Sequence, residues 1–426
     1  MSGQNICMSY IYNFNGTNIP SWIKILFWVL YIIPFLLLWG KVIYNKKIKF
    51  PKTIKTYAYI FFSALFAVVY CIYFDYLFWL LYIIPFLFLM VKALYKKNIF
   101  PKTITTYIFI IYFALFAVLY CIGDDYFAYR DWVYGRDFTF WTKEQVYVLL
   151  ILLCKLLPTN YPYEVFRLIV WGGAIILVYF SARRYREELN PGMVVLFLFV
   201  LYCGSFCYAR ASLAMSVFFA GLSLFFYAQG RLQKVLSMML TVSSFFFHYE
   251  MIVGIALLPC LSIPFEKRKS RIFILVVFVI GLAVISYLLS NPQFVDILFG
   301  NDDMSDKIED FNDKEGGSFR VSTFVNYFKY YLLLFLFSVY LKKNNEIEKF
   351  ILGLYRITCG IIMVATIFAI VAGVRSTYTY RILYISMIPL SIMLSYFYFN
   401  GYVKKQHMIL ILFFAFLSNS VRFINS

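Results

Sequence analysis

The chain has 426 residues, of which 63% are hydrophobic and only 14% are charged, and its formal net charge is +18. Soluble globular domains are about 45–50% apolar and about 25% charged, so this composition excludes a soluble globular protein. The apolar runs are about 20 residues long, and they predict an all-α polytopic integral membrane protein with about 12 to 14 transmembrane helices. The positive charge lies mainly in short loops between apolar runs, which indicates cytoplasmic loops and gives no reason to expect a nucleic-acid partner.

Two repeated hairpins follow a polar segment at residues 1–21, which we expect on the extracytoplasmic side. The sequence LFWVLYIIPFL at 26–36 returns as LFWLLYIIPFL at 77–87, and each copy contains two apolar runs around a basic loop. We therefore assign residues 22–126 to duplicated transmembrane hairpins. The repeat has two explanations, a recent duplication without a chemical role or the paired repeats of a transporter.

The next stretch, residues 127–162, is an outer loop that contains a short apolar piece at 145–157. This piece is too short to cross a bilayer comfortably, so it predicts a re-entrant or interfacial helix. A central transmembrane block at 163–290 follows, then an acidic extracytoplasmic loop at 291–323 and a C-terminal transmembrane block at 324–426. The acidic loop is either a solvated connection or a flap over a substrate channel.

Loop charge predicts the orientation of the chain. Basic residues concentrate in alternate loops, which places these loops in the cytoplasm and both termini outside. The sequence shows no metal-ligand pattern. It has only two histidines, His248 and His407, and its eight cysteines form no C-x-x-C pair. No glycine-rich nucleotide motif occurs either, so we expect neither a metal nor another cofactor.

Ionisable residues at the ends of predicted spans gather on the outer side, where Arg210, Arg375 and Arg381 lie. Guanidinium groups match phosphate oxygens and stay charged in a partly dry site, so these arginines suit a lipid-linked pyrophosphate. Each is also explained as an interface anchor or as half of an ion pair. His248, with Glu250 two residues later, suits a general base or a phosphate ligand, and its alternative role is a hydrogen-bonded interface residue.

Carboxylates and aromatic rings are mixed in the first large outer loop. Asp125, Tyr126, Tyr129 and Arg130 lie within the sequence GDDYFAYR. Aromatic faces pack against the C–H faces of sugar rings while carboxylates bond their hydroxyl groups, so this combination suits a carbohydrate. Tyrosine is also common at any membrane interface, which is the alternative explanation.

Three motifs carry a family likeness, and their order and spacing tell more than any one of them. They are GDDYFAY at 123–129, YARASLA through FFHYE at 208–250, and TYRILYIS at 379–386. Together they resemble the pattern of EpsG-like, Wzy-type polysaccharide polymerases over residues 105–400. Leu119 and Ala211 stand where that family often has arginine and glutamine.

The resemblance implies a GT-C-like glycosyltransferase of the bacterial inner membrane, with a site built by its outer-face loops. It would join undecaprenyl-pyrophosphate-linked oligosaccharide repeats into O-antigen, capsular or exopolysaccharide without a metal, alongside a flippase and a chain-length regulator of the same pathway. The implied catalytic residues are Arg210, His248 and Asp125. The implied residues that bind pyrophosphate and sugar are Arg375, Arg381, Tyr126, Tyr129, Arg130 and Glu250.

Three other functions share parts of this pattern. An O-antigen ligase has the same frame and outer arginines but transfers finished glycan to a different acceptor. A flippase or other transporter is expected to show inverted repeats and charges near mid-span, whereas the charges here gather at one membrane face. A membrane O-acyltransferase usually needs a histidine deep in the frame, and His248 lies at a span end.

Overall fold

The computed structural model describes most of the chain from position 145 onward. The described residues are 145–159, 162–206, 209–266, 321–343, 347–371 and 377–425, with short pieces between positions 82 and 134 and between 276 and 283. Side chains at several helix ends, among them 203–206, 209–210 and 420–425, are not part of the description. The regular structure within the described residues is helical, with no strand. This confirms the prediction of an all-α protein.

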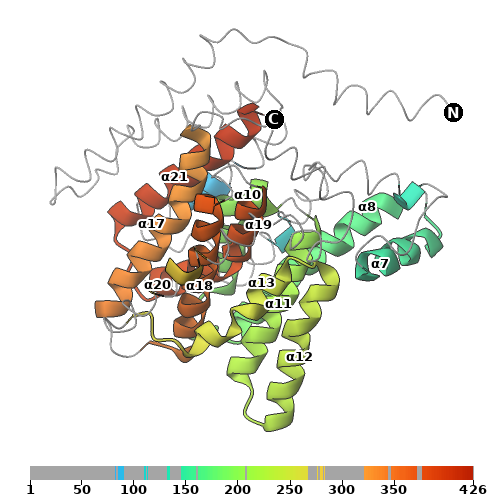
Figure 1. Ribbon diagram of the computed structural model, residues 1–426. Helices are drawn as coiled ribbons and strands as arrows, with labels where there is room; N and C mark the ends of the chain where they lie inside the picture. The colour runs from blue at the N-terminus through green and yellow to red at the C-terminus, as the bar shows by residue number, and fades with distance from the viewer. Residues whose placement is uncertain are drawn as a thin grey trace, which may run out of the picture. The chain divides into compact units, whose positions relative to one another are not determined.

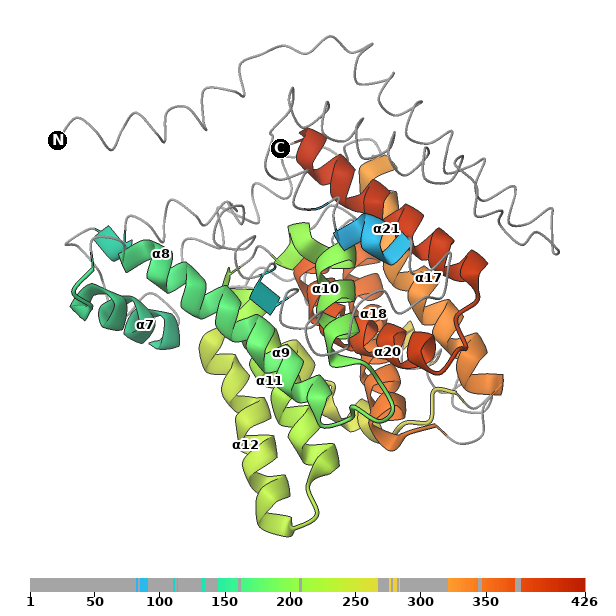
Figure 2. The ribbon, with the colours of Figure 1, turned by 180° about the vertical axis from the view of Figure 1, so that it is seen from behind.

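The described helices follow one another along the chain as Figures 1 and 2 show. Their bounds are α7 Gln145–Leu156, α8 Pro162–Arg167, η3 Leu168–Gly172, α9 Gly173–Arg183, α10 Pro191–Phe206, α11 Ala209–Tyr227, α12 Arg231–Phe247, α13 Met251–Ala256, η4 Leu258–Ser262, α17 Val321–Lys343, α18 Lys349–Val371, α19 Thr377–Ile385, α20 Met387–Phe399 and α21 Lys405–Asn425.

The chain divides into two compact units, residues 1–97 with 404–413 and residues 98–403 with 414–426. In the first unit, Tyr82 and Phe86 are described and their ring centroids lie 6.0 Å apart. Most of the predicted repeated hairpins lies outside the described residues. The candidate site belongs to the second unit.

Two described helices are long and apolar enough to cross a membrane. One is Pro162–Arg183, which joins α8, the π-helical turn η3 and α9, and the other is Lys349–Ile370 in α18. The pair α19 and α20 passes the same test together, although it is bent by 41° at Ser386. Pro389 accounts for this bend because it lacks the N–H that would bond to the carbonyl of Ile385. The chain is a membrane protein, as its composition predicts.

α7 occupies the stretch for which a short re-entrant or interfacial helix is predicted. It has 12 residues and is therefore about 18 Å long, too short to cross the hydrocarbon layer. Tyr147 and Ile151 are buried, and the Tyr147 ring meets that of Phe166 in α8. Leu149 and Leu153 are exposed. A short helix with one buried face is present here, and its depth in the bilayer stays a prediction.

α11 and α12 form a closely packed antiparallel hairpin (Figure 1). Small residues meet at its interface, where Gly221 of α11 and Ser237 and Thr241 of α12 are buried. A side chain at Gly221 would collide with the Thr241 hydroxyl and would lie 2.6 Å from the Thr241 backbone nitrogen. Small residues allow membrane helices to approach closely, and glycine has this function in the hairpin.

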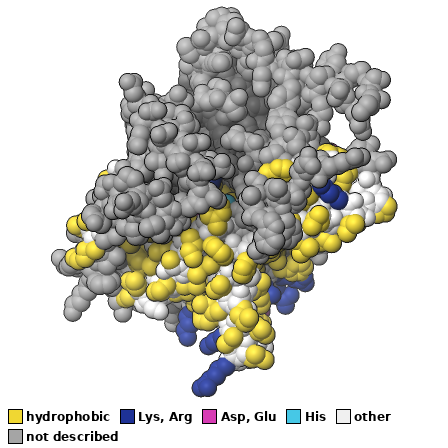
Figure 3. Space-filling view, turned by 45° about the vertical axis from the view of Figure 1, so that its right-hand side comes forward, with side chains coloured by type: hydrophobic (Ala, Val, Ile, Leu, Met, Phe, Trp, Pro, Cys, Tyr) yellow, Lys and Arg dark blue, Asp and Glu magenta, His cyan; other side chains and the backbone are white. Residues whose placement is uncertain are grey.

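On the face seen in Figure 3, the visible surface of the described helices is mainly hydrophobic. On α12, for example, Leu232, Leu236 and Met239 are exposed. Arg231 and Lys234 are also exposed, at the end of the hairpin where α11 turns into α12. An apolar helix surface with basic residues at one end is typical of a membrane helix whose basic end faces the cytoplasm.

An arginine inside α18 ties this helix to the segment that follows η4. The Arg356 guanidinium donates to both carboxylate oxygens of Glu266, at 2.7 Å and 3.3 Å, and also to the carbonyl of Leu261 at 3.0 Å. Nearby, a side chain at Gly360 of α18 would lie 2.9 Å from Cys260 Sγ in η4. These contacts fix α13 and η4 against α18, and they thereby position the turn that begins α13.

Candidate functional site

The turn between α12 and α13 brings an imidazole and a carboxylate together. α12 ends at Phe247, and His248 leaves the helix with extended backbone at φ −159° and ψ 119°. The next helix begins at Met251, whose backbone N–H bonds to the His248 carbonyl at 3.0 Å. Within this turn His248 Nε2 lies 3.0 Å from Glu250 Oε2. The two side chains that the sequence nominates separately are therefore hydrogen-bonded partners.

Arg381 reaches the same carboxylate from α19, which packs against α13. Its Nη1 donates to Glu250 Oε1 at 2.7 Å, so each oxygen of Glu250 has its own partner. His248, Glu250 and Arg381 together are called the Glu250 cluster below. The side chains of His248 and Glu250 are 6% and 10% exposed, whereas that of Arg381 is 29% exposed. Arg381 is thus the member of the cluster that solvent or a ligand reaches most easily.

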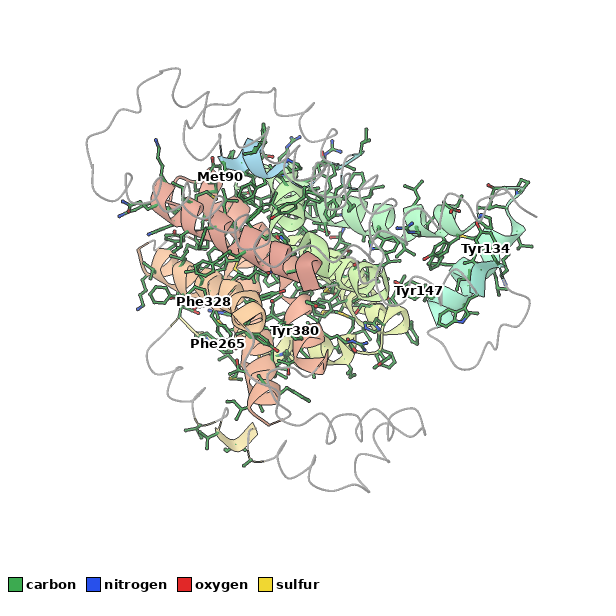
Figure 4. All side chains as sticks on the ribbon, turned by 90° about the horizontal axis from the view of Figure 1, so that it is seen from above. Met90, Tyr134, Tyr147, Phe265, Phe328 and Tyr380 are labelled. Carbon is green, nitrogen blue, oxygen red and sulfur yellow. The ribbon has the colours of Figure 1, made fainter. Side chains whose placement is uncertain are left out.

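α17 packs beside the helix that carries Arg381. Tyr380, labelled in Figure 4, comes directly before Arg381, and its ring centroid lies 4.9 Å from that of Tyr327 in α17. α19 also packs against α18 and α11. Four helices therefore support the short helix that positions the guanidinium.

The Glu250 carboxyl is held in its ionised form by its two partners. Burial has the largest effect and raises the pKa of Glu250, but the hydrogen bonds and charges of His248 and Arg381 together outweigh it. The pKa of Glu250 consequently lies below its usual value. A nearly buried carboxylate that is ionised needs such donors, because a charge without them would be costly to bury.

This arrangement has a defined acid–base chemistry. When His248 Nε2 carries a proton and donates it to Glu250, Nδ1 becomes the nitrogen through which the ring exchanges a proton. The carboxylate holds the ring in one orientation, as the acidic member does in other acid–base pairs of this kind. Arg381 adds a positive charge next to the imidazole. The cluster can therefore remove a proton from a hydroxyl group and stabilise negative charge beside it.

The described residues contain no group of three or more His, Cys, Asp or Glu side chains that could hold a metal ion. The Glu250 cluster contains only one carboxylate and one imidazole, and both are engaged with each other. Its chemistry as described is that of an acid–base and cationic site.

The sequence from residue 119 to residue 426 matches the EpsG family. The chain belongs to the EpsG family. No curated protein and no solved structure matches it. The matched region contains the whole Glu250 cluster, and it begins within the second repeated hairpin, so the first copy of the repeat lies outside the part shared with the family. EpsG membership makes this a membrane protein related to polysaccharide.

Arg210 of this EpsG family protein lies at the same end of the hairpin as His248. α11 begins at Ala209, so the backbone of Arg210 is in its first turn, and α12 ends at Phe247. Because the two helices are antiparallel, the start of α11 and the end of α12 are neighbours, and α11 also packs against α13 and α19. The Arg210 side chain is outside the described residues.

The remaining nominated residues lie outside the described residues. They are Asp125, Tyr126, Tyr129, Arg130 and Arg375. The closest described part of the first outer loop is a helical piece at 132–134. There the Tyr134 hydroxyl donates to Glu164 Oε2 at 3.2 Å, which connects this loop to α8.

Three ionisable residues of the EpsG family protein were not nominated from the sequence, although they lie inside helices. Arg167, buried in α8, lies under the rings of Tyr163 and Trp171 at 5.8 Å and 5.4 Å. Lys329 is buried in α17, and Arg356 forms the ion pair in α18. A charged residue within a long apolar run is itself a signal of function or tight packing, and this signal was available. The charges are therefore not confined to the span ends.

Proposed function

We propose that this EpsG family protein is a polymerase that joins undecaprenyl-pyrophosphate-linked oligosaccharide repeat units. The product would be O-antigen, capsular or exopolysaccharide, made at the outer face of the bacterial inner membrane. The observation that carries the proposal is the Glu250 cluster, in which an imidazole and a guanidinium share one ionised carboxylate. The match to the EpsG family supports the polysaccharide chemistry.

The reaction breaks the bond between the donor sugar's anomeric carbon and its pyrophosphate oxygen, and forms a bond from that carbon to an acceptor hydroxyl oxygen. The hydroxyl proton goes to a base, and undecaprenyl pyrophosphate leaves with the bonding electrons. The protein must therefore supply a base, stabilise the departing negative charge and align the acceptor. We assign no metal to this step, because guanidinium groups can stabilise the pyrophosphate.

In this mechanism His248 takes the acceptor proton, and Glu250 holds the imidazole in place. Arg381 and Arg210 stabilise the leaving pyrophosphate, and Arg375 assists them. Asp125, Tyr126, Tyr129 and Arg130 contact the sugar and position the acceptor hydroxyl. Glu250 has a positioning role in this assignment, because both of its oxygens are occupied by His248 and Arg381. A flippase and a chain-length regulator act before and beside the enzyme, and its fold is expected to be GT-C-like.

The length distribution of surface and lipid-linked glycan tests the function in a strain without this gene. A polymerase predicts that the ladder of long glycan collapses to a single lipid-linked repeat. Long glycan that stays on its carrier would instead identify a ligase, and repeats trapped on the cytoplasmic side would identify a transporter. Complementation with Arg381→Ala should leave the collapse in place. Lys342→Ala, an exposed residue of α17, should restore the ladder.

A further inference from the structure

Tyrosine side chains of α17 and α19 gather next to Arg381. The ring centroids of Tyr327 in α17 and Tyr380 in α19 lie 4.9 Å apart. Tyr331 is four residues after Tyr327, and it therefore lies on the same face of α17. Its hydroxyl oxygen is 2.7 Å from that of Thr366 in α18. Tyr327, Tyr331, Tyr380 and Thr366 are called the tyrosine cluster below.

The tyrosine cluster is partly open. Tyr327 is buried, whereas Tyr331, Tyr380 and Thr366 are half-buried. Arg381, which follows Tyr380 directly in α19, is half-buried as well. A ligand that reaches the guanidinium therefore also finds aromatic rings and hydroxyl groups beside it.

The hydroxyl groups of the cluster have a defined direction of donation. The Thr366 hydroxyl donates to the carbonyl of Ile362 at 2.6 Å. Tyr331 must therefore be the donor in its hydrogen bond to Thr366. Because a phenol oxygen that donates its proton can still accept one, the Tyr331 oxygen can accept a hydrogen bond from a hydroxyl group of a ligand.

The tyrosine cluster lies near the helix ends that we assign to the outer side, namely the starts of α17 and α19 and the end of α18. At about 1.5 Å per residue, Tyr327, Thr366 and Tyr380 lie roughly 4 to 9 Å from those ends. This level is close to the headgroup region of the outer leaflet. A sugar that is bonded to a lipid pyrophosphate resides at the same level.

The covalent structure of the donor fixes where its first sugar must lie. In the proposed function Arg381 binds the leaving pyrophosphate, and the first sugar is bonded directly to this group. Successive residues of a helix differ by only about 1.5 Å in height and by about 100° in direction. Tyr380 is thus at the height of the guanidinium, and it points toward α17 while Arg381 points toward Glu250 of the α12–α13 turn.

We propose that the tyrosine cluster binds the first sugar of the donor, the one that is bonded to the leaving pyrophosphate. The inference rests on the proposed function and adds a carbohydrate site to it. The Tyr380 ring packs against a C–H face of the sugar, and the Tyr331 oxygen accepts a hydrogen bond from a sugar hydroxyl group. Tyrosine suits this role because it combines a large apolar ring with a polar end.

Two probes that differ by one sugar test this site. The first is undecaprenyl pyrophosphate, and the second is undecaprenyl pyrophosphate that carries the first sugar of the organism's own repeat unit. Their dissociation constants are measured with the full chain in lipid nanodiscs. The wild type should bind the second probe about tenfold more tightly, because the sugar adds a hydrogen bond and ring contacts.

The variants separate recognition of the sugar from recognition of the pyrophosphate. Tyr380→Ala should remove the difference between the two probes and leave the affinity for undecaprenyl pyrophosphate unchanged. Arg381→Ala should weaken both probes by the same factor and keep the difference. Tyr331→Phe keeps the ring and should reduce the difference by about threefold, because one hydrogen bond is lost.

Tyr402→Ala is the matched control, because Tyr402 is also half-buried and lies at the opposite end of the bundle, after α20. It should keep the full difference between the probes. Thermal unfolding of each variant shows whether it is folded, and Tyr331→Phe decides the question if Tyr380→Ala does not fold.

Three results would overturn the inference and leave the proposed function standing. In the first, the wild type binds both probes equally tightly. In the second, folded Tyr380→Ala and Tyr331→Phe keep the wild-type difference, which would make the cluster a packing contact. In the third, Tyr380→Ala weakens both probes by the same factor. A wild type that binds neither probe would overturn the proposed function as well.

Discussion

Glu250 and Arg381, which are 131 residues apart in the sequence, are joined by a hydrogen bond of 2.7 Å between Oε1 and Nη1. The other carboxylate oxygen is 3.0 Å from His248 Nε2. Neither contact follows from helical periodicity, and together they connect the central and the C-terminal parts of the bundle. The Glu250 cluster is therefore both a packing contact and a candidate catalytic group.

Glu250→Gln should lower the rate of chain extension by about 100-fold or more, because acid–base catalysis contributes on that scale. The amide removes the negative charge and places a donor against the donor of His248 or of Arg381. The rate would be measured in isolated membranes with a lipid-linked repeat unit. Glu187→Gln is the control, since it removes an exposed carboxylate outside the Glu250 cluster, and it should leave the rate unchanged.

The stability of the protein should depend on pH through Glu250. The folded state lowers the pKa of Glu250 below its ordinary value of 4.5, so its stabilising effect is fully present above that value. It is lost as pH falls through the lower pKa of the folded state. Thermal unfolding in detergent between pH 6 and pH 3 should show the midpoint falling more steeply for the wild type than for Glu250→Gln. Equal slopes would contradict the ion pair.

Gly221→Ala should destabilise the α11–α12 hairpin. The new methyl group would collide with the Thr241 hydroxyl and lie 2.9 Å from the Ser237 carbonyl oxygen, so the helices must separate. Overpacking of this kind costs about 1–3 kcal/mol, which a lower unfolding temperature in detergent would reveal. Gly230→Ala in the turn of the same hairpin is the control, because nothing lies within 4 Å of the added carbon. Equal unfolding temperatures for the two variants would refute the close approach.

Arg210→Ala should abolish chain extension while expression stays normal. Arg210 lies in the first turn of α11, at the end of the hairpin that carries His248. A guanidinium at this position supports the departing pyrophosphate in the proposed mechanism. The measurement is the glycan ladder in a complemented deletion strain, with protein amount determined in the same membranes. A normal ladder would remove Arg210 from the site.

The sequence permits the helical membrane class to be predicted with ease, because long apolar runs leave no other fold. It also nominates His248, Glu250 and Arg381, each from its position near a span end. Their pairing was not predictable, because it depends on the extended backbone at His248 and on the packing of α13 against α19. Both are properties of tertiary structure that local sequence does not encode.

The surroundings of Arg381 and Lys329 also become clear only in the folded chain. The sequence places Arg381 at the end of a predicted span, but α19 starts at Thr377 and the chain bends at Ser386, so Arg381 lies inside a helix. Lys329 stands out in the sequence as a charged residue in an otherwise apolar run. Only the folded chain shows the carbonyl and the rings that surround its ammonium group.

The two partners of Glu250 lie far apart in the sequence, and this has a consequence for biosynthesis. His248 emerges from the ribosome just before Glu250, whereas Arg381 is made 131 residues later. Until α19 is synthesised and inserted, the Glu250 carboxylate has only His248 of its two native hydrogen-bond partners. A chain truncated before α19 therefore cannot assemble the site, and quality control of the nascent protein would encounter an incompletely paired charge until the C-terminal helices arrive.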